Sequence, residues 1–153
     1  MRLLNQVIFM FLLMLSVKAQ VYQWAKGIGG AESDVGQAIA VDAEGNVYTT
    51  GYFSGTVDFD PGPGVVQWSS SGDRDIFILK TDKFGNLLWV NTLGGTSLDV
   101  PYSIALDNSG YFCVSGLFSE TVDFDPGPNK MELVAEKYWD VFVAKFKFSG
   151  VLI

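Results

Sequence analysis

The chain has 153 residues and a formal net charge of −7, with 10 basic and 17 acidic side chains. This balance argues against nucleic acid and anionic membranes as partners, because both are bound through clusters of Lys and Arg. The sequence has no His, which excludes imidazole catalysis and His-ligated zinc, and its single Cys113 can form no disulfide within the chain.

The first 19 residues have the pattern of a secretory signal peptide. Arg2 gives a basic start, an apolar run follows over 7–17, and Ala19 is a small residue suited to cleavage. The run is shorter than the roughly 20 residues that a spanning helix needs. We therefore expect a secreted or cell-surface protein with no transmembrane segment after cleavage; the alternative is a buried N-terminal helix.

A seven-residue stretch at 57–63, Val-Asp-Phe-Asp-Pro-Gly-Pro, returns unchanged at 122–128. The offset of 65 residues holds from position 20 onward without insertion or deletion, so that Trp24, for example, matches Trp89. A period of this length indicates a supersecondary unit that contains several elements.

Within one unit the sequence predicts two β-hairpins. Runs rich in β-branched and aromatic residues at 38–42 and 46–53 flank a turn of the form Asp-x-x-Gly-Asn, in which Gly45 supplies a positive φ. The same device joins 76–80 to 87–91 around Gly85. Matching strands are expected in the second unit at 103–106, 111–118 and 141–146, with a last one starting at 151.

The third strand of each unit is apolar on both faces, as Ile76 to Leu79 and Val141 to Val143 illustrate. An antiparallel strand with one wet face would alternate apolar and polar residues, so these sheets are expected to lie between two other layers. Stacked four-stranded antiparallel sheets are the blades of a β-propeller. The sequence therefore predicts an all-β fold with about two blades, a partial propeller.

The repeat divides the chain into a signal peptide (1–19), the outer strand of a blade (20–33), a full repeat (34–98) and a truncated second repeat (99–153). A closed propeller takes about four to eight blades. We therefore expect the N-terminal fragment of a longer protein with further blades in cis. The alternative is a short chain whose copies assemble one ring.

Three motifs, each present twice, resemble the beta-propeller repeat (SBBP repeat) family of secreted bacterial proteins. In the first unit they are Ile39-Ala40-Val41-Asp42-x-x-Gly45-Asn46-Val47-Tyr48, the stretch at 57–62, and Asp75-Ile76-Phe77-Ile78-x-Lys80. The resemblance covers about residues 20–153. It implies an exported propeller, often part of a large surface protein, and it implies no single activity.

The repeated stretch also suggests a metal site, formed by Asp58 and Asp60 in the first unit and by Asp123 and Asp125 in the second. Two carboxylates two residues apart before a Gly turn resemble the start of a calcium loop, although the full twelve-residue pattern is absent. The alternative is a structural connection that anchors its Phe and uses the Asp side chains to bind loop amides. Calcium is thus the one cofactor the sequence suggests.

Two further pairs of residues are candidates for a functional site, and each pair has a purely structural alternative. Asp75 and Asp140 could form an acid pair, but their recurrence favours turn capping. Trp68 and Trp139 break the repeat and could form a sugar platform or pack between blades.

The sequence therefore predicts no catalytic site and a binding or scaffold module at the cell surface, with a glycan or a protein as partner. The alternatives are a glycan-active enzyme on a propeller scaffold and a short-chain lectin.

Overall fold

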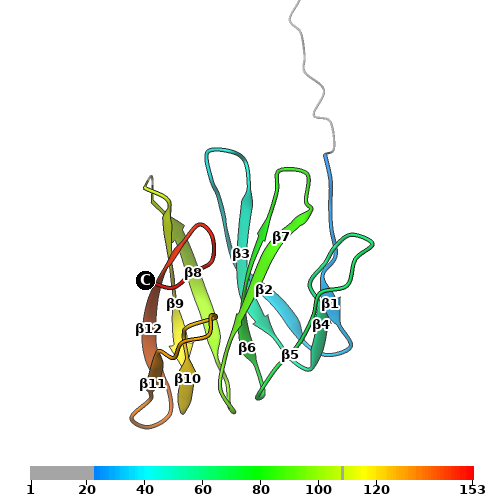
Figure 1. Cartoon of the computed structure of the whole chain (residues 1–153). Coiled ribbons are helices and arrows are strands. Elements are labelled where there is room, and N and C mark those ends of the chain that lie inside the picture. Colours follow the sequence, from blue (N-terminus) through cyan, green and yellow to red (C-terminus); the bar gives the residue numbers. More distant parts are fainter. Residues whose placement is uncertain (1–22, 108) are drawn as a thin grey trace, which may run out of the picture.

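The computed structural model describes residues 23–107 and 109–153, which form β-strands and no helix (Figure 1). Two larger sheets lie side by side, and short hairpins border them. Within the described ranges no helix is long and apolar enough to cross a membrane. The predicted signal peptide at 1–19 lies outside these ranges.

The first large sheet, called blade 1, has four antiparallel strands in the order β2-β3-β6-β7. These are β2 (Asp34–Val41), β3 (Val47–Phe53), β6 (Asp75–Thr81) and β7 (Leu87–Leu93). The β2–β3 and β6–β7 turns lie at the same end of the sheet (Figure 1). Gly45 and Gly85 occupy them with φ of 86° and 80°, as the sequence predicts.

The second large sheet, called blade 2, contains β8 (Val100–Leu106), β9 (Tyr111–Phe118) and β12 (Asp140–Lys147) in the order β12-β9-β8. At the edge of β12, where a fourth strand would pair, the described residues form one isolated bridge, between Phe146 and Leu152. The matched residues Thr81 and Leu87 form the first pair of the β6–β7 ladder in blade 1. The prediction of a four-stranded blade is therefore confirmed in the first unit. In the second unit the sheet has three strands.

Each connection between the hairpins forms a small hairpin that the sequence did not predict. The first pairs β4 (Thr56–Asp58) with β5 (Gln67–Ser69), and the second pairs β10 (Thr121–Asp123) with β11 (Glu132–Val134). These strands have three residues each, too few to show a hydrophobic period.

The outer strand predicted at 20–33 is represented in the described residues by β1 (Gly29–Gly30), which pairs with β4. Residues 23–28 form no strand. The reason is that a strand needs a partner, and the described residues contain no preceding blade beside this segment.

The main core lies between the two blades. Tyr48, Ile76 and Ile78 of blade 1 pack against aromatic residues of blade 2, among them Phe112 and Phe146, and all five are at most 1% exposed. The ring of Phe112 lies 5.4 Å from that of Tyr48 and 5.2 Å from that of Phe146. Burial of one such side chain contributes about 1.5–3 kcal/mol, so this interface holds the blades in a fixed arrangement.

Phe59 and Phe124, the aromatic residues of the repeated stretch, anchor the connections as expected. Phe59 meets Phe53 edge-on at 5.2 Å, and Phe124 meets Phe118 edge-on at 5.5 Å. Both anchors are at most 2% exposed. The two units thus repeat one another in packing as well as in sequence.

Burial of the third strand on both faces is confirmed only in blade 1. Every residue of β6 is buried. In blade 2, Phe142 is 2% exposed but Val141 and Val143 are 71% and 72% exposed, so the expectation was wrong there. The physical reason is that no layer of the described chain covers that side of β12.

Candidate functional site

The two blades are joined by contacts at one end of the outer strand. The indole Nε1 of Trp89, on β7, donates to the carbonyl of Phe148 at 3.2 Å, and the ring lies against Gly150. Trp24 repeats this joint at the preceding position, because its Nε1 donates to the carbonyl of Lys83 at 2.9 Å and its ring lies against Gly85. Both turns favour Gly because φ is 80° at Gly85 and 87° at Gly150. A Cβ would also press on the Trp24 ring at Gly85 and on the Asn91 Nδ2 at Gly150.

A buried aspartate fixes the opposite end of the joint. Asp99 is fully buried and accepts hydrogen bonds from the amides of Gly95 at 2.8 Å and Ser119 at 3.0 Å. Burial raises the pKa of Asp99, and these hydrogen bonds only partly oppose the effect. Asp34, the matched residue, accepts from the amide of Gly30 at 2.7 Å. Asp99 thus ties down the segment that connects blade 1 to blade 2, and Asp34 does the same for the segment that precedes blade 1.

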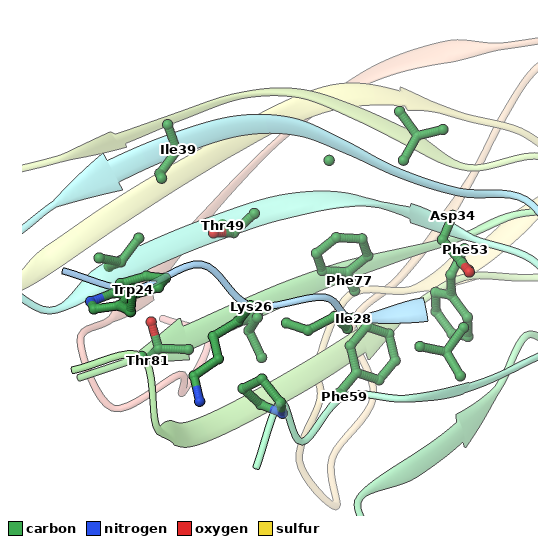
Figure 2. Close-up of a pocket in the computed structure, with 17 residues that line it drawn as sticks. Trp24, Lys26, Ile28, Asp34, Ile39, Thr49, Phe53, Phe59, Phe77 and Thr81 are labelled. Atoms are coloured by element: carbon green, nitrogen blue, oxygen red, sulfur yellow. The ribbon is translucent and has the colours of Figure 1, made fainter. Parts of the chain in front are cut away.

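An apolar hollow of about 310 Å³ lies on the side of blade 1 that faces away from blade 2 (Figure 2). Phe53, Phe59 and Phe77 gather at one end of it. The segment from Trp24 to Ile28 crosses the hollow, and Ile39 lies on its β2 side with 66% of its surface exposed. An apolar surface of this kind suits a protein contact better than a polar ligand.

A second, more polar hollow of about 290 Å³ lies between the blades and is called the interblade groove. The first unit contributes residues from β5 and the loop after it, from the start of β6 and from β7, and the second unit contributes its repeated stretch. The lining side chains used below are Trp68, Ser69, Ser71, Asp75, Asn91, Thr92, Asp123 and Asp125. The groove therefore combines one aromatic surface with hydroxyl, amide and carboxylate groups.

Trp68 is the aromatic member of this groove and lies on β5 with 45% of its surface exposed. It has no aromatic counterpart in the second unit, where Leu133 stands at the matched position. Trp139, the other tryptophan outside the repeat pattern, lies directly before β12, is 59% exposed and does not line the groove. Neither indole is buried between the two described blades.

Asp75 lines the groove from the start of β6 and is only 3% exposed. Its Oδ2 accepts from the amide of Ser71 at 2.9 Å, whereas its buried Oδ1 has no hydrogen-bond partner in the structure. Burial raises the pKa of this carboxyl group. The matched Asp140 accepts from the amide of Glu136 at 3.1 Å, so both residues cap a turn as the sequence suggests.

The four predicted metal ligands lie in two separate connections, one in each unit. Asp58 Oδ1 accepts from the amides of Asp60 at 3.1 Å and Val66 at 2.9 Å, and Asp60 Oδ1 accepts from Gly62 at 2.7 Å. The carboxylates thus close the loop, as the structural alternative requires.

The repeated stretch of the second unit forms the same hydrogen-bond network. Asp123 Oδ1 accepts from Asp125 at 3.0 Å and Met131 at 2.9 Å, and Asp125 Oδ1 accepts from Gly127 at 2.8 Å. The Met131 amide, opposed by partial burial, lowers the pKa of Asp123. Over residues 23–107 and 109–153, no three Asp, Glu, Cys or His side chains gather closely enough to hold a metal ion. A calcium ion at either pair would need backbone or water oxygens as well, and calcium binding stays a prediction.

Comparison with known proteins agrees with this architecture. Residues 23–55 match the family model described as Beta-propeller repeat. A WD repeat-containing protein of Acanthamoeba polyphaga mimivirus, itself uncharacterized, is 30% identical over 112 residues, which cover 64% of this chain. The matched region spans only 8% of that viral protein's length. No solved structure gives a significant match.

The sequence repeat, the sheets and these matches together support a β-propeller repeat architecture, with propeller-like blades as the fold.

Proposed function

We propose that this protein is a non-catalytic binding module in which a rigid pair of propeller blades holds a ligand in the interblade groove. The observation that carries this proposal is the position of Trp68, a half-exposed indole outside the repeat pattern, among polar side chains. A residue that departs from the repeat is a better candidate for ligand contact than a matched residue, because the repeat preserves the residues that pack and cap the blades.

The ligand class that suits the groove is a neutral glycan. An indole face offers an apolar surface to the C–H face of a sugar ring, and the surrounding groups hydrogen-bond its hydroxyls. Ser69 and Ser71 line one side of the groove, and Asn91 and Thr92 of β7 line the other. The Asn91 Nδ2 already donates to the carbonyl of Gly150 at 2.7 Å. Asp75 lines the groove as well, but its unpartnered Oδ1 is buried and offers no accessible acceptor to a sugar in this structure.

The second candidate function is a glycan-active enzyme, and one observation favours it. Asp75, Asp123 and Asp125 line the same groove, and burial raises the pKa of Asp75 in the way a general acid requires. Glycosidases use two carboxylates that flank the scissile bond. Against this, Asp75 and Asp123 already bind backbone amides that shape their own loops.

We place the module outside the cell, at or beyond the cell envelope. This part of the proposal is supported by the basic start, apolar run and small residues within 1–19. Determining the N-terminal residue of the protein recovered from a culture medium or envelope fraction tests it. A chain that keeps residues 1–19 and stays inside the cell would contradict export.

The ligand proposal is tested by titrating neutral oligosaccharides against the protein and following tryptophan fluorescence. Trp68→Ala is expected to weaken binding about 5- to 150-fold, if a stacked sugar gains the roughly 1–3 kcal/mol that a base gains on an aromatic side chain. Trp139→Ala is the matched control, since it removes another exposed indole outside the groove and should leave the affinity unchanged.

The same reactions, sampled for released sugar, separate the two candidate functions. Binding without turnover supports the module. Turnover that Asp75→Asn abolishes would favour the enzyme, and equal affinities of the Trp68 and Trp139 variants would contradict the groove as the site.

A further inference from the structure

The blades present matched faces, of which one is covered and the other open. The face of blade 1 toward blade 2, called its back face, carries Ile76 and Ile78, both fully buried. On the back face of blade 2 the matched Val141 and Val143 are 71% and 72% exposed. The open back face of blade 2 therefore presents the same kind of β-branched surface that blade 1 buries.

The opposite sides, called front faces, show the converse. Ile104 on the front face of blade 2 is 8% exposed because blade 1 covers it, whereas the matched Ile39 on blade 1 is 66% exposed beside the apolar hollow. In Figure 1 these open faces lie at opposite sides of the stack. Within residues 23–107 and 109–153, the molecule thus carries both halves of its own blade-to-blade interface, each without its counterpart.

The backbone repeats this complementarity. β6 pairs with β3 on one edge and with β7 on the other, but β12 pairs with β9 and, within the described residues, has only the Phe146–Leu152 bridge on its other edge. An open strand edge is a template for a strand from another chain. The segment that matches the paired part of β7 is 24–28, which forms no ladder.

We propose that the open front face of blade 1, together with residues 24–28, binds the open back face of blade 2 in a second copy of the chain. The interface within the chain sets the register. Trp89 lies opposite Lys80 and Leu93 opposite Ile76, so Trp24 of one copy lies opposite Lys145 of the other, and Ile28 lies opposite Val141.

The polar contacts of the covered interface carry over in the same way. Lys80 Nζ reaches the carbonyl of Phe148 at 3.5 Å, and its side chain faces Asp42 at 3.6 Å. Lys145 keeps the matching partner, Asp107, at 4.0 Å on the open back face. The Lys145 amino group of the second copy then donates to the Lys83 carbonyl of the first copy, the same acceptor that Trp24 uses within the first copy.

A second copy is the occupant because the new contact continues an interface that the molecule already makes. Such a contact is head to tail, so it repeats with one rotation per blade and leads to a ring or an open stack. No residue of the interblade groove takes part, so the inference stands or falls separately from the ligand.

The test is the molar mass of the full chain in solution, measured over a range of concentrations by analytical ultracentrifugation. Oligomers that dissociate on dilution are expected. Ile39→Glu blocks the open front face and Val143→Glu blocks the open back face, and each should weaken association about a hundredfold or more by forcing a carboxylate into an apolar contact.

Val65→Glu is the control for an added exposed charge. Val65 is 70% exposed, and its match in blade 2, Lys130, keeps a side chain 74% exposed although blade 2 is covered by blade 1. The control should assemble like the parent chain. All three substitutions replace exposed side chains, so circular dichroism should show unchanged strand content.

Mixing the two blocked variants gives the sharpest outcome. Each keeps the face that the other has lost, so the mixture should form a dimer and stop there, while each variant alone stays monomeric. A folded parent chain that is monomeric at all concentrations would overturn the proposal and leave the open faces to adjoining blades of a longer polypeptide. Assembly that survives both substitutions would overturn it as well.

Discussion

The back faces of the two blades carry matched residue types, but the back face of blade 1 is covered by blade 2 and the back face of blade 2 is exposed. The pair of Lys80 and Asp42 in blade 1 has side-chain exposures of 11% and 2%, whereas the matched pair of Lys145 and Asp107 in blade 2 has 50% and 42%. The same residue types at the same register are core in one blade and surface in the other. The comparison teaches that in a repeat protein the neighbour, rather than the unit itself, decides which residues form the core.

The largest effect should come from truncating matched residues on the two back faces. Ile78→Ala removes a fully buried side chain between the blades and should cost about 2–5 kcal/mol of unfolding free energy. Val143→Ala, at the matched exposed position, should change the stability of the isolated chain by about 0.5 kcal/mol or less. Denaturant titrations of dilute protein measure both, and equal losses would break the comparison.

A smaller effect is expected from calcium, which would act on both blades alike. If Asp58 with Asp60 and Asp123 with Asp125 bind the ion, calcium at ten times its dissociation constant adds about 1.4 kcal/mol per site. Melting temperatures with calcium and with EDTA measure this. Asp60→Asn and Asp125→Asn should each remove about half of this gain in stability. A melting temperature that changes neither with calcium nor with EDTA would contradict calcium binding.

The smallest effect concerns the dependence of stability on acid. The contribution of Asp99, which is buried where the blades meet, should have the opposite sign to that of Asp107 on the open back face of blade 2. Burial raises the pKa of Asp99, so as the pH falls the folded chain takes up this proton before the unfolded chain does. That uptake adds stability in acid. Asp107, whose pKa is lowered chiefly by the amide of Tyr111, stabilises the fold above the ordinary value of 3.8 and loses this contribution as the pH falls below it.

Melting temperatures between about pH 6 and pH 3 test these signs, because this window includes the ordinary aspartate pKa of 3.8, from which the two groups are shifted in opposite directions. Asp99→Asn should make the loss of stability in acid steeper, and Asp107→Asn should make it shallower. Parallel curves for the two variants would contradict the assignment. The parent chain, measured in the same buffers, supplies the reference slope.

Much of the fold could be predicted from local signals. The turns at Gly45 and Gly85 require a positive φ, and the Asp-x-x-Gly-Asn pattern in the sequence predicts it at both positions. Phe59 and Phe124 were expected as anchors because they alternate with aspartates along an extended stretch. The small β5 and β11 strands were missed because three residues carry no period.

The candidate site was only partly visible in the sequence. Trp68 stood out because it breaks the 65-residue repeat. Nothing local indicated that Asp75 and the second repeated stretch would line the same groove as Trp68, because these residues come from two units and meet only when the blades stack. A signal of this kind requires the relative position of the two sheets.

The sequence by itself determined the unit: its strands, its turns, its aromatic anchors and its 65-residue repetition. These depend on interactions within a few residues or across one hairpin, and such interactions leave a pattern along the chain. Only the tertiary structure decided which of two equivalent faces is buried and where a groove opens. Burial depends on whether a neighbouring layer is present, and Val141 reads as apolar core in the sequence although it is 71% exposed in the fold.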